Sequence, residues 1–251
     1  MLDVLKEAGR QVRSLQRAKH RPWPMPEGRW VGAQTWEELL FAHWPVPIEN
    51  VRHRVPRELD VEVHDGSAWV GIVPFRLTGL RLRGTVALPR ISSFLEVNVR
   101  TYVRDAEGKP GVWFFSLDAS NALAVRAGRR LYKLPYFDAR MSLERRDGWR
   151  EYECVRSAEH GKAFSGRYRP VGKVFQAKPG SLEWFLAERY CLYTTDRRGL
   201  LRGEIHHAQW PLQRAEAELR LISIAPFGLE GDPLCHFSPR QDALLWPLER
   251  I

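Results

Sequence analysis

The chain has 251 residues with a hydrophobic fraction of 44%, enough for a large packed core, and no apolar run reaches the ~18 residues that a membrane-spanning helix needs. Its net charge is +9, but 6 − 2 = +4 of that charge lies in residues 1–22, which carry six Lys or Arg and two carboxylates. Basic charge alone is a weak mark of a nucleic-acid partner, so we expect a soluble, cytoplasmic protein that binds no nucleic acid.

The N-terminal segment differs in composition from the rest of the chain. Residues 2–19 place their apolar side chains loosely on one side, which predicts a basic amphipathic helix. Proline at every second position over residues 22–26 then favours an extended linker. We expect residues 1–26 to form this helix and linker, and residues 27–251 to form a single domain. The basic segment leaves open a role in binding an acidic partner or a membrane surface.

Three short segments carry helix signals. Thr35 and Glu38 have the spacing of a capping box, which predicts a helix that ends before Pro45. Residues 56–59 begin with proline and predict a helical turn. Residues 181–189 follow a Pro-Gly pair and predict a further helix.

From about residue 61 the apolar pattern has a period of two residues, which is typical of strands. Asp-Gly pairs at residues 65–66 and 147–148 indicate tight hairpin turns. This spacing predicts an α+β fold that is mostly antiparallel β, with the sheet curled into a barrel and a few peripheral helices. The predicted strands cover residues 61–63, 68–75, 94–104, 112–119, 139–146, 149–157, 163–169, 190–194, 200–207 and 215–224.

The strand predicted at residues 94–104 has one polar and one apolar face. Glu96, Asn98 and Arg100 share the polar face, and valines alternate with them. If this face meets solvent, no site follows from it. If it lines a barrel interior, the carboxylate and the guanidinium each need a partner or a ligand, because about 13 Å of strand separates them.

Several segments carry a pattern that extends over roughly residues 30–248: Trp36 with residues 39–46, then 96–103, 114–119, 134–136, 189–193, His207 and 210–212. Through these segments the chain resembles the YqjF-like family, bacterial proteins of unknown function. That family in turn resembles the acetoacetate decarboxylases. The resemblance implies a cone-like antiparallel β-barrel with a closed interior cavity.

Residues 127–137 resemble the active-site segment of the acetoacetate decarboxylases. Ala127-Gly128-Arg129 matches that segment, whereas Tyr136 and Phe137 occupy its two lysine positions. The resemblance therefore implies that Schiff-base chemistry cannot run here, because it needs an activated, unprotonated amine. Glu96 stands where those enzymes place a cavity glutamate.

Other chemistries lack their motifs. Lys133 is the lysine nearest to Tyr136, but its odd offset would direct it to the opposite face of a strand. Glu204, His206 and His207 do not have the spacing of a metal site, and the three cysteines form no CxxC pair. We expect neither a metal nor a cofactor.

We therefore predict a cavity that binds a small oxygenated organic acid or carbonyl compound. Arg100 would hold a carboxylate or carbonyl oxygen through charge-assisted hydrogen bonds. Glu96 would act as an acid or base if burial raises its pKa, with Tyr136 as a second catalytic candidate, so a lyase or isomerase is an alternative. The sequence determines neither the ligand nor the oligomeric state. The remaining candidate ligand-binding residues are Asn98, Ser116, Asp118 and Arg129, with Ser116 and Asp118 expected on the face of Phe114.

Overall fold

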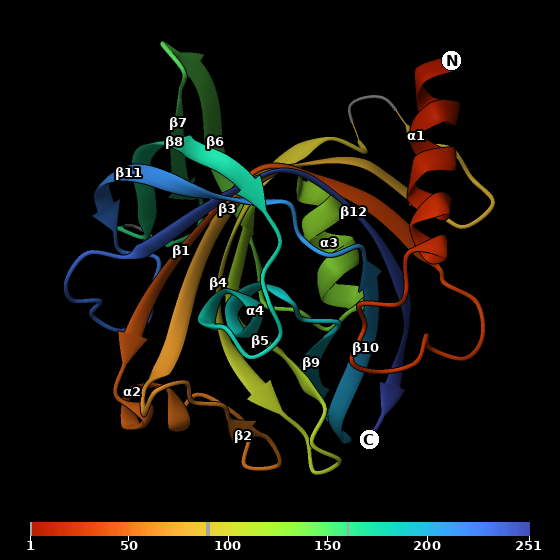
Figure 1. Ribbon diagram of the computed structural model, residues 1–251, viewed down its shortest axis with the longest axis horizontal. Helices are drawn as coiled ribbons and strands as arrows, with labels where there is room; N and C mark the ends of the chain where they lie inside the picture. Colours follow the sequence, from red (N-terminus) through yellow and green to blue (C-terminus); the bar gives the residue numbers. More distant parts are fainter. Residues whose placement is uncertain (1, 89–90, 160) are drawn as a thin grey trace.

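The computed structural model describes residues 2–88, 91–159 and 161–251 (Figure 1). No helix in these ranges is long and apolar enough to cross a membrane. The helices are α1 (Leu2–Arg13), the 3-10 turn Ser14–Gln16, α2 (Ile48–Arg52), α3 (Ala122–Leu131) and α4 (Leu182–Ala187). The strands are β1 (Gly32–Val46), β2 (Asp60–Val61), β3 (Ala68–Leu82), β4 (Phe94–Arg104), β5 (Pro110–Ala119), β6 (Tyr136–Arg146), β7 (Trp149–Arg156), β8 (Ala163–Phe175), β9 (Cys191–Asp196), β10 (Gly199–His207), β11 (Leu212–Ile222) and β12 (Leu234–Arg250).

The strands form one sheet that closes into two rings. Both rings contain β12, β1, β3, β4 and β5; the first ring returns from β5 to β12 through β6, β7, β8 and β11, and the second through β9 and β10. Figure 1 shows β6, β7, β8 and β11 on the left and β9 and β10 on the right, with the shared strands between and around them. Among the described strands, β5 pairs in parallel with β6 and β9, and the other pairings are antiparallel. The predicted mostly antiparallel, barrel-like fold with few helices is confirmed.

The two rings have separate cores on opposite faces of the shared strands. The core of the first ring includes Val97, Val99 and Phe164, from β4 and β8. The core of the second ring includes Tyr102 of β4 and Ile205 of β10. A strand such as β4 is therefore buried on both faces, and polar residues on either face lie inside the protein.

Residues 35–41 lie in β1 and not in a helix, so that prediction was wrong. β1 pairs along its length with β12 and β3, and tertiary pairing of this extent outweighs a local capping pattern. The Thr35 hydroxyl donates to Asp242 at 2.7 Å instead of capping a helix. Glu38 has a φ of 55° at an irregularity in the β1–β3 pairing, where two arginines of the β6–β7 hairpin bind its carboxylate.

Three elements, α2, α3 and β12, lacked a sequence-based prediction. β12 contains Pro239 and Pro247, which obscure the period-two pattern of a strand. α3 follows Asn121, whose side chain accepts hydrogen bonds from backbone N–H groups of the first turn. Residues 56–59 form a hydrogen-bonded turn and not a helix. The helix predicted at residues 181–189 is α4, and Ser181 caps it.

The N-terminal segment packs on the outside of the second ring. Gln11 is buried and donates to the Gly79 carbonyl at 3.0 Å. Arg10 pairs with Asp242 at 2.7 Å, and the buried Arg21 lies 3.6 Å from Glu204. The predicted helix ends at Arg13, and the 3-10 turn continues to Gln16.

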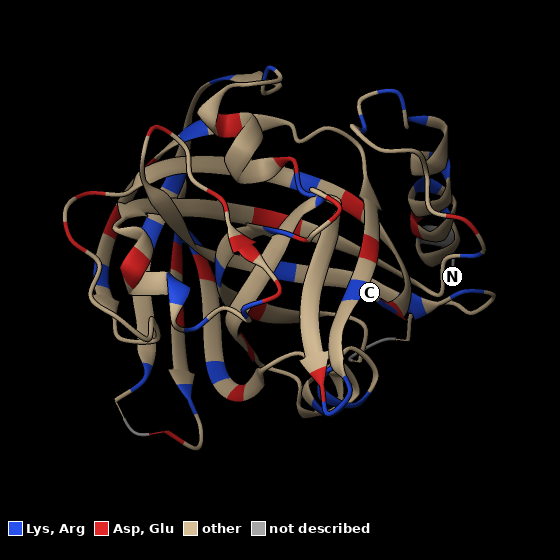
Figure 2. Cartoon of the chain, turned by 90° about the horizontal axis from the view of Figure 1, so that it is seen from below, with Lys and Arg blue, Asp and Glu red and all other residues tan. Residues whose placement is uncertain are grey.

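Charges of both signs are interleaved along the strands (Figure 2). On β8 and β11, Arg167 pairs with Glu218 and Arg169 pairs with Glu216 across the strands. Such exposed pairs add little to the folding stability.

Candidate functional site

A polar cluster lies on the second-ring face of the shared strands. Cross-strand pairs place Glu96 beside Phe75, Asn98 beside Val73 and Arg100 beside Gly71. Directly paired residues of antiparallel strands point to the same face. The alternation predicted for β4 is therefore confirmed, and its polar face lies in the interior and not in solvent. We define the candidate ligand site as His43, Glu96, Asn98, Arg100 and Tyr136.

Ser116 and Asp118 do not belong to this cluster. Ser116 pairs with Val99 and Asp118 with Val97, so both face the core of the first ring. An irregularity in the pairing between Val99 and Arg100 adds one residue on β5 and reverses the alternation there. The expectation that both share the face of Phe114 was wrong for this reason.

Asp118 has a structural partner in the first ring. Its carboxylate is completely buried and accepts two hydrogen bonds from Arg156, at 2.7 and 3.0 Å. The Arg156 guanidinium also lies 3.7 Å from the centre of the Phe137 ring. Phe137, at the second lysine position of the decarboxylase segment, thus packs on an internal ion pair.

Glu96 is buried beside Tyr136. It is 3% exposed, and its Oε2 accepts a hydrogen bond from the Tyr136 hydroxyl at 3.0 Å. Burial raises the pKa of Glu96 from its ordinary 4.5 to about 8, against the opposing effect of the Tyr136 bond. A protonated carboxyl can donate a hydrogen bond to a ligand oxygen while still accepting one from Tyr136.

The decarboxylase-like segment positions Tyr136. A side chain on Gly128 of α3 would place its Cβ 2.5 Å from the Tyr136 ring, so only glycine permits this approach. Arg129 is exposed, and its Nε donates to the Tyr136 carbonyl at 2.6 Å. Burial and the neighbouring Glu96 carboxyl raise the pKa of Tyr136 well above its ordinary value. Gly128 and Arg129 thus fix the position of Tyr136.

Arg100 forms no ion pair with any Asp or Glu of the described residues. Its guanidinium lies 5.4 Å from the centre of the Phe41 ring and 5.6 Å from that of Tyr102. Its Nη2 donates to the Leu186 carbonyl of α4 at 3.3 Å. No ion pair joins Arg100 and Glu96, both of which the structure describes.

His43 is a member of the site that sequence reasoning missed. Its Nε2 lies 2.6 Å from the Tyr102 hydroxyl, and a Cβ at Gly71 would come within 3.0 Å of the His43 ring. Burial, and secondarily Arg100, lower the pKa of His43 well below its ordinary value, so the ring is neutral. His43 lies two residues after Phe41 and shares its strand face, and this spacing was the signal in the sequence. The prediction of a helix at residues 35–41 hid that signal.

Three polar atoms of this site are buried without a hydrogen-bond partner among the described residues. They are Nδ1 of His43, Oδ1 of Asn98 and Nε of Arg100. Buried polar groups of native proteins are nearly always hydrogen-bonded, so each such atom requires an explanation.

The site contains no lysine. All seven lysines lie in the described ranges, and each is exposed or half-buried. Lys133 lies outside the strands with a φ of 53°, and its Nζ donates to the Arg130 carbonyl at 2.7 Å. Lys109 pairs with Glu204 outside the site. His207 lies in the second ring with its ring 6.2 Å from that of Trp36, whereas His206 bonds to the N-terminal segment.

Comparison with known proteins places this geometry in context. Residues 33–242 match the model of DUF2071, a family of uncharacterized conserved proteins. The chain is 42% identical over 239 residues to the uncharacterized protein YqjF of Bacillus subtilis, covering 94% of this chain and 98% of YqjF. The resemblance to the YqjF-like family is therefore confirmed.

Solved structures share the fold at low sequence identity. Acetoacetate decarboxylase of Legionella pneumophila has a TM-score of 0.62 at 11% identity, covering 94% of both chains. The enduracididine biosynthesis enzyme MppR, solved with pyruvate, has a TM-score of 0.60 at 11% identity, covering 92% of both chains. An acetoacetate decarboxylase-like enzyme of Sphingomonas wittichii has a TM-score of 0.61 at 13% identity, covering 92% of this chain and 97% of that one. The chain thus has the acetoacetate decarboxylase-like fold.

Proposed function

Because the chain belongs to the DUF2071 family and has the acetoacetate decarboxylase-like fold, we propose that it binds a small oxygenated organic acid or carbonyl compound, without Schiff-base chemistry. The ligand would occupy the candidate ligand site in the second ring. MppR of the same fold was solved with pyruvate, which makes pyruvate a reasonable first probe.

The observation that carries this proposal is Arg100, a half-buried guanidinium that has no carboxylate partner among the described residues. Its Nε is buried and has no hydrogen-bond acceptor among the described residues. Desolvating a charge without a counter-charge is costly, and a ligand carboxylate would supply both the charge and the acceptors. Arginine binds carboxylates with two parallel hydrogen bonds, a geometry that lysine does not provide.

The other members of the site favour an anion that carries a second oxygen. Glu96 and His43 are neutral at pH 7, so Arg100 supplies the charge of the site. The protonated Glu96 would donate to a carbonyl or hydroxyl oxygen of the ligand. Asn98 lies between Arg100 and Glu96 on the same strand face, and its amide would bond the part of the ligand between them.

Thermal denaturation with added ligands tests the proposal. Pyruvate, acetoacetate and 4-oxopentanoate would be screened against the wild-type protein and Arg100→Met, with methyl pyruvate as the uncharged control. A ligand at 100 times its Kd stabilises the native state by about 2.7 kcal/mol, which a melting curve detects. We expect at least one of the acids to stabilise the wild type. The same acid should not stabilise Arg100→Met, and methyl pyruvate should not stabilise the wild type. Equal stabilisation of Arg100→Met, or none of the wild type, would contradict the proposal.

The Glu96–Tyr136 pair favours a second candidate function, acid–base catalysis by a lyase or isomerase. A carboxyl with a pKa of about 8 can give and take protons near neutral pH. For this candidate, Glu96→Gln would abolish turnover of the bound ligand while leaving its affinity nearly unchanged. Turnover that persists in Glu96→Gln would exclude Glu96 as the catalytic group.

A further inference from the structure

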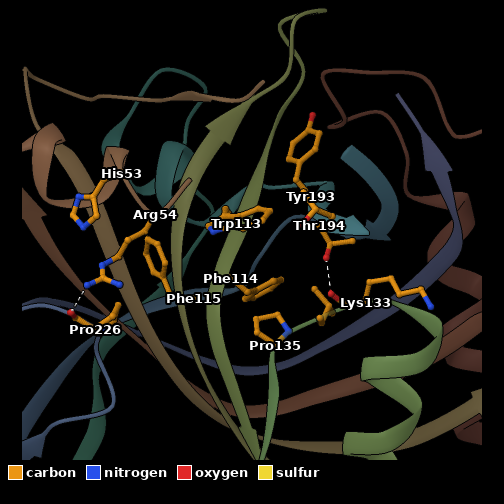
Figure 3. A pocket seen from close by; sticks show the side chains of 12 residues that line it. His53, Arg54, Trp113, Phe114, Phe115, Lys133, Pro135, Tyr193, Thr194 and Pro226 are labelled. Atoms are coloured by element: carbon orange, nitrogen blue, oxygen red, sulfur yellow. Dashed lines mark hydrogen bonds between the residues drawn. The ribbon is translucent and has the colours of Figure 1, made fainter. Parts of the chain in front are cut away.

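A hollow of about 520 Å³ lies where the two rings separate (Figure 3). One edge of β5 pairs with β9 at Val112–Trp113 and with β6 at Leu117–Ala119. The hollow occupies the interval between these two pairings. It includes none of the residues of the candidate ligand site, and its volume is in the range of small-molecule sites.

Three consecutive aromatic residues of β5 form one wall of this hollow. Trp113, Phe114 and Phe115 are all half-buried, although they alternate between the two faces of the strand. Phe227 holds the Phe115 ring edge-on at a centroid distance of 5.3 Å. Partly exposed, fixed aromatic rings offer surfaces on which a planar ligand can stack.

The charged groups around the hollow are cationic. Its lining includes Arg54 and Lys133 and no Asp or Glu. Figure 3 shows Arg54 beside the aromatic wall, whereas the Lys133 side chain extends away from it. Arg54 is exposed and donates to the Pro226 carbonyl at 3.2 Å, and it forms no ion pair within the described chain. Its remaining N–H donors can bind an anionic group.

We propose that this hollow binds a planar aromatic ring that carries an anionic group, either a carboxylate or a phosphate. The ring stacks on the wall formed by Trp113 and Phe115, and Arg54 binds the anion. This site goes beyond the proposed function, because its residues and its ligand differ from those of the second-ring site.

Calorimetric titration tests the proposal with two anionic probes, 2-naphthoate and adenosine monophosphate, and with the neutral 2-naphthamide. We expect at least one of the two anionic probes to bind. Arg54→Met should weaken this binding by about tenfold or more, as expected for a charge-assisted hydrogen bond. Trp113→Ala should weaken the binding several-fold. The neutral 2-naphthamide should bind to the wild type as weakly as 2-naphthoate binds to Arg54→Met.

Arg54 is exposed, so its replacement should leave the fold intact. Arg100→Met should retain the naphthoate or nucleotide binding, and Arg54→Met should retain any response to pyruvate, so the two sites are tested separately. Absence of heat with both anionic probes, or equal affinity in Arg54→Met and wild type, would overturn the proposal.

Discussion

Glu96 and Arg100 share one strand face, but their surroundings give them different charge states. Burial without a cationic partner keeps Glu96 protonated, with a pKa of about 8. Arg100 is a guanidinium that lies against the aromatic rings of Phe41 and Tyr102. The site thus combines an uncharged hydrogen-bond donor, the Glu96 carboxyl, with a guanidinium donor, Arg100. This combination suits a ligand with a carboxylate at one end.

The raised pKa of Glu96 predicts a pH dependence of folding stability. Between about pH 4.5 and 8 the unfolded chain loses the Glu96 proton while the folded protein keeps it. The contribution of Glu96 to the folding stability is therefore fully present below about pH 4.5, and it is lost as the pH rises to about 8. Glu96→Gln removes this dependence, so its stability relative to wild type should rise by a few kcal/mol from pH 5 to pH 8.5.

Urea denaturation at a series of pH values measures this difference. Glu58→Gln, at an exposed position, is the matched control and should follow the wild type. Parallel stability curves for wild type and Glu96→Gln would show that Glu96 is ionised in the folded protein.

At the scale of elements, α3 and the start of β6 form the unit that sets the position of Tyr136. Gly128 lets the helix approach the ring, and Arg129 holds the backbone of the strand. Gly128 and Arg129 of the decarboxylase-like segment therefore have a physical role here that does not depend on a lysine.

Gly128→Ala tests this role. Alanine favours a helix interior over glycine by about 1 kcal/mol, but a Cβ 2.5 Å from the Tyr136 ring forces a displacement. We expect the clash to dominate, so that thermal stability falls and ligand stabilisation weakens. Gly9→Ala in α1 is the matched control, since its Cβ would meet Arg13 at an ordinary 3.6 Å, and it should stabilise the protein slightly. A Gly128→Ala protein as stable as Gly9→Ala would contradict the account.

How far the sequence predicts each element depends on whether its signal is local. The polar face of β4 could be predicted because its alternation is unbroken from Phe94 to Tyr102. The faces of Ser116 and Asp118 could not, because the irregularity beside Arg100 arises only when β4 and β5 pair. Likewise, the place of His43 in the site could not be predicted, because it depends on β1 being a strand between β12 and β3.

At the scale of the whole molecule, the two rings place an internal ion pair and the candidate ligand site on opposite faces of the shared strands. The first ring encloses an apolar core with the saturated Asp118–Arg156 pair. The second ring encloses the candidate ligand site, with its unpartnered polar atoms. Replacing a residue of β4 or β5 that faces the first ring should therefore change folding stability, whereas replacing one that faces the second ring should change ligand binding.

Asp118→Asn tests this division. The substitution leaves Arg156 with only Glu159 as a partner, and breaking a buried ion pair costs about 3 kcal/mol of folding stability. Because Asp118 faces the first ring, the variant should keep its ligand response wherever it remains folded. Loss of ligand binding without loss of stability would place Asp118 in the site instead.

The most direct test of the central claim is calorimetric titration of pyruvate, acetoacetate and 4-oxopentanoate into wild type, Arg100→Met and Asp118→Asn at a temperature where all three are folded. The account predicts that at least one of these acids binds wild type and Asp118→Asn with similar affinity, and binds Arg100→Met about tenfold or more weakly. Equal affinity for wild type and Arg100→Met, or no binding of any of them to the wild type, would contradict it.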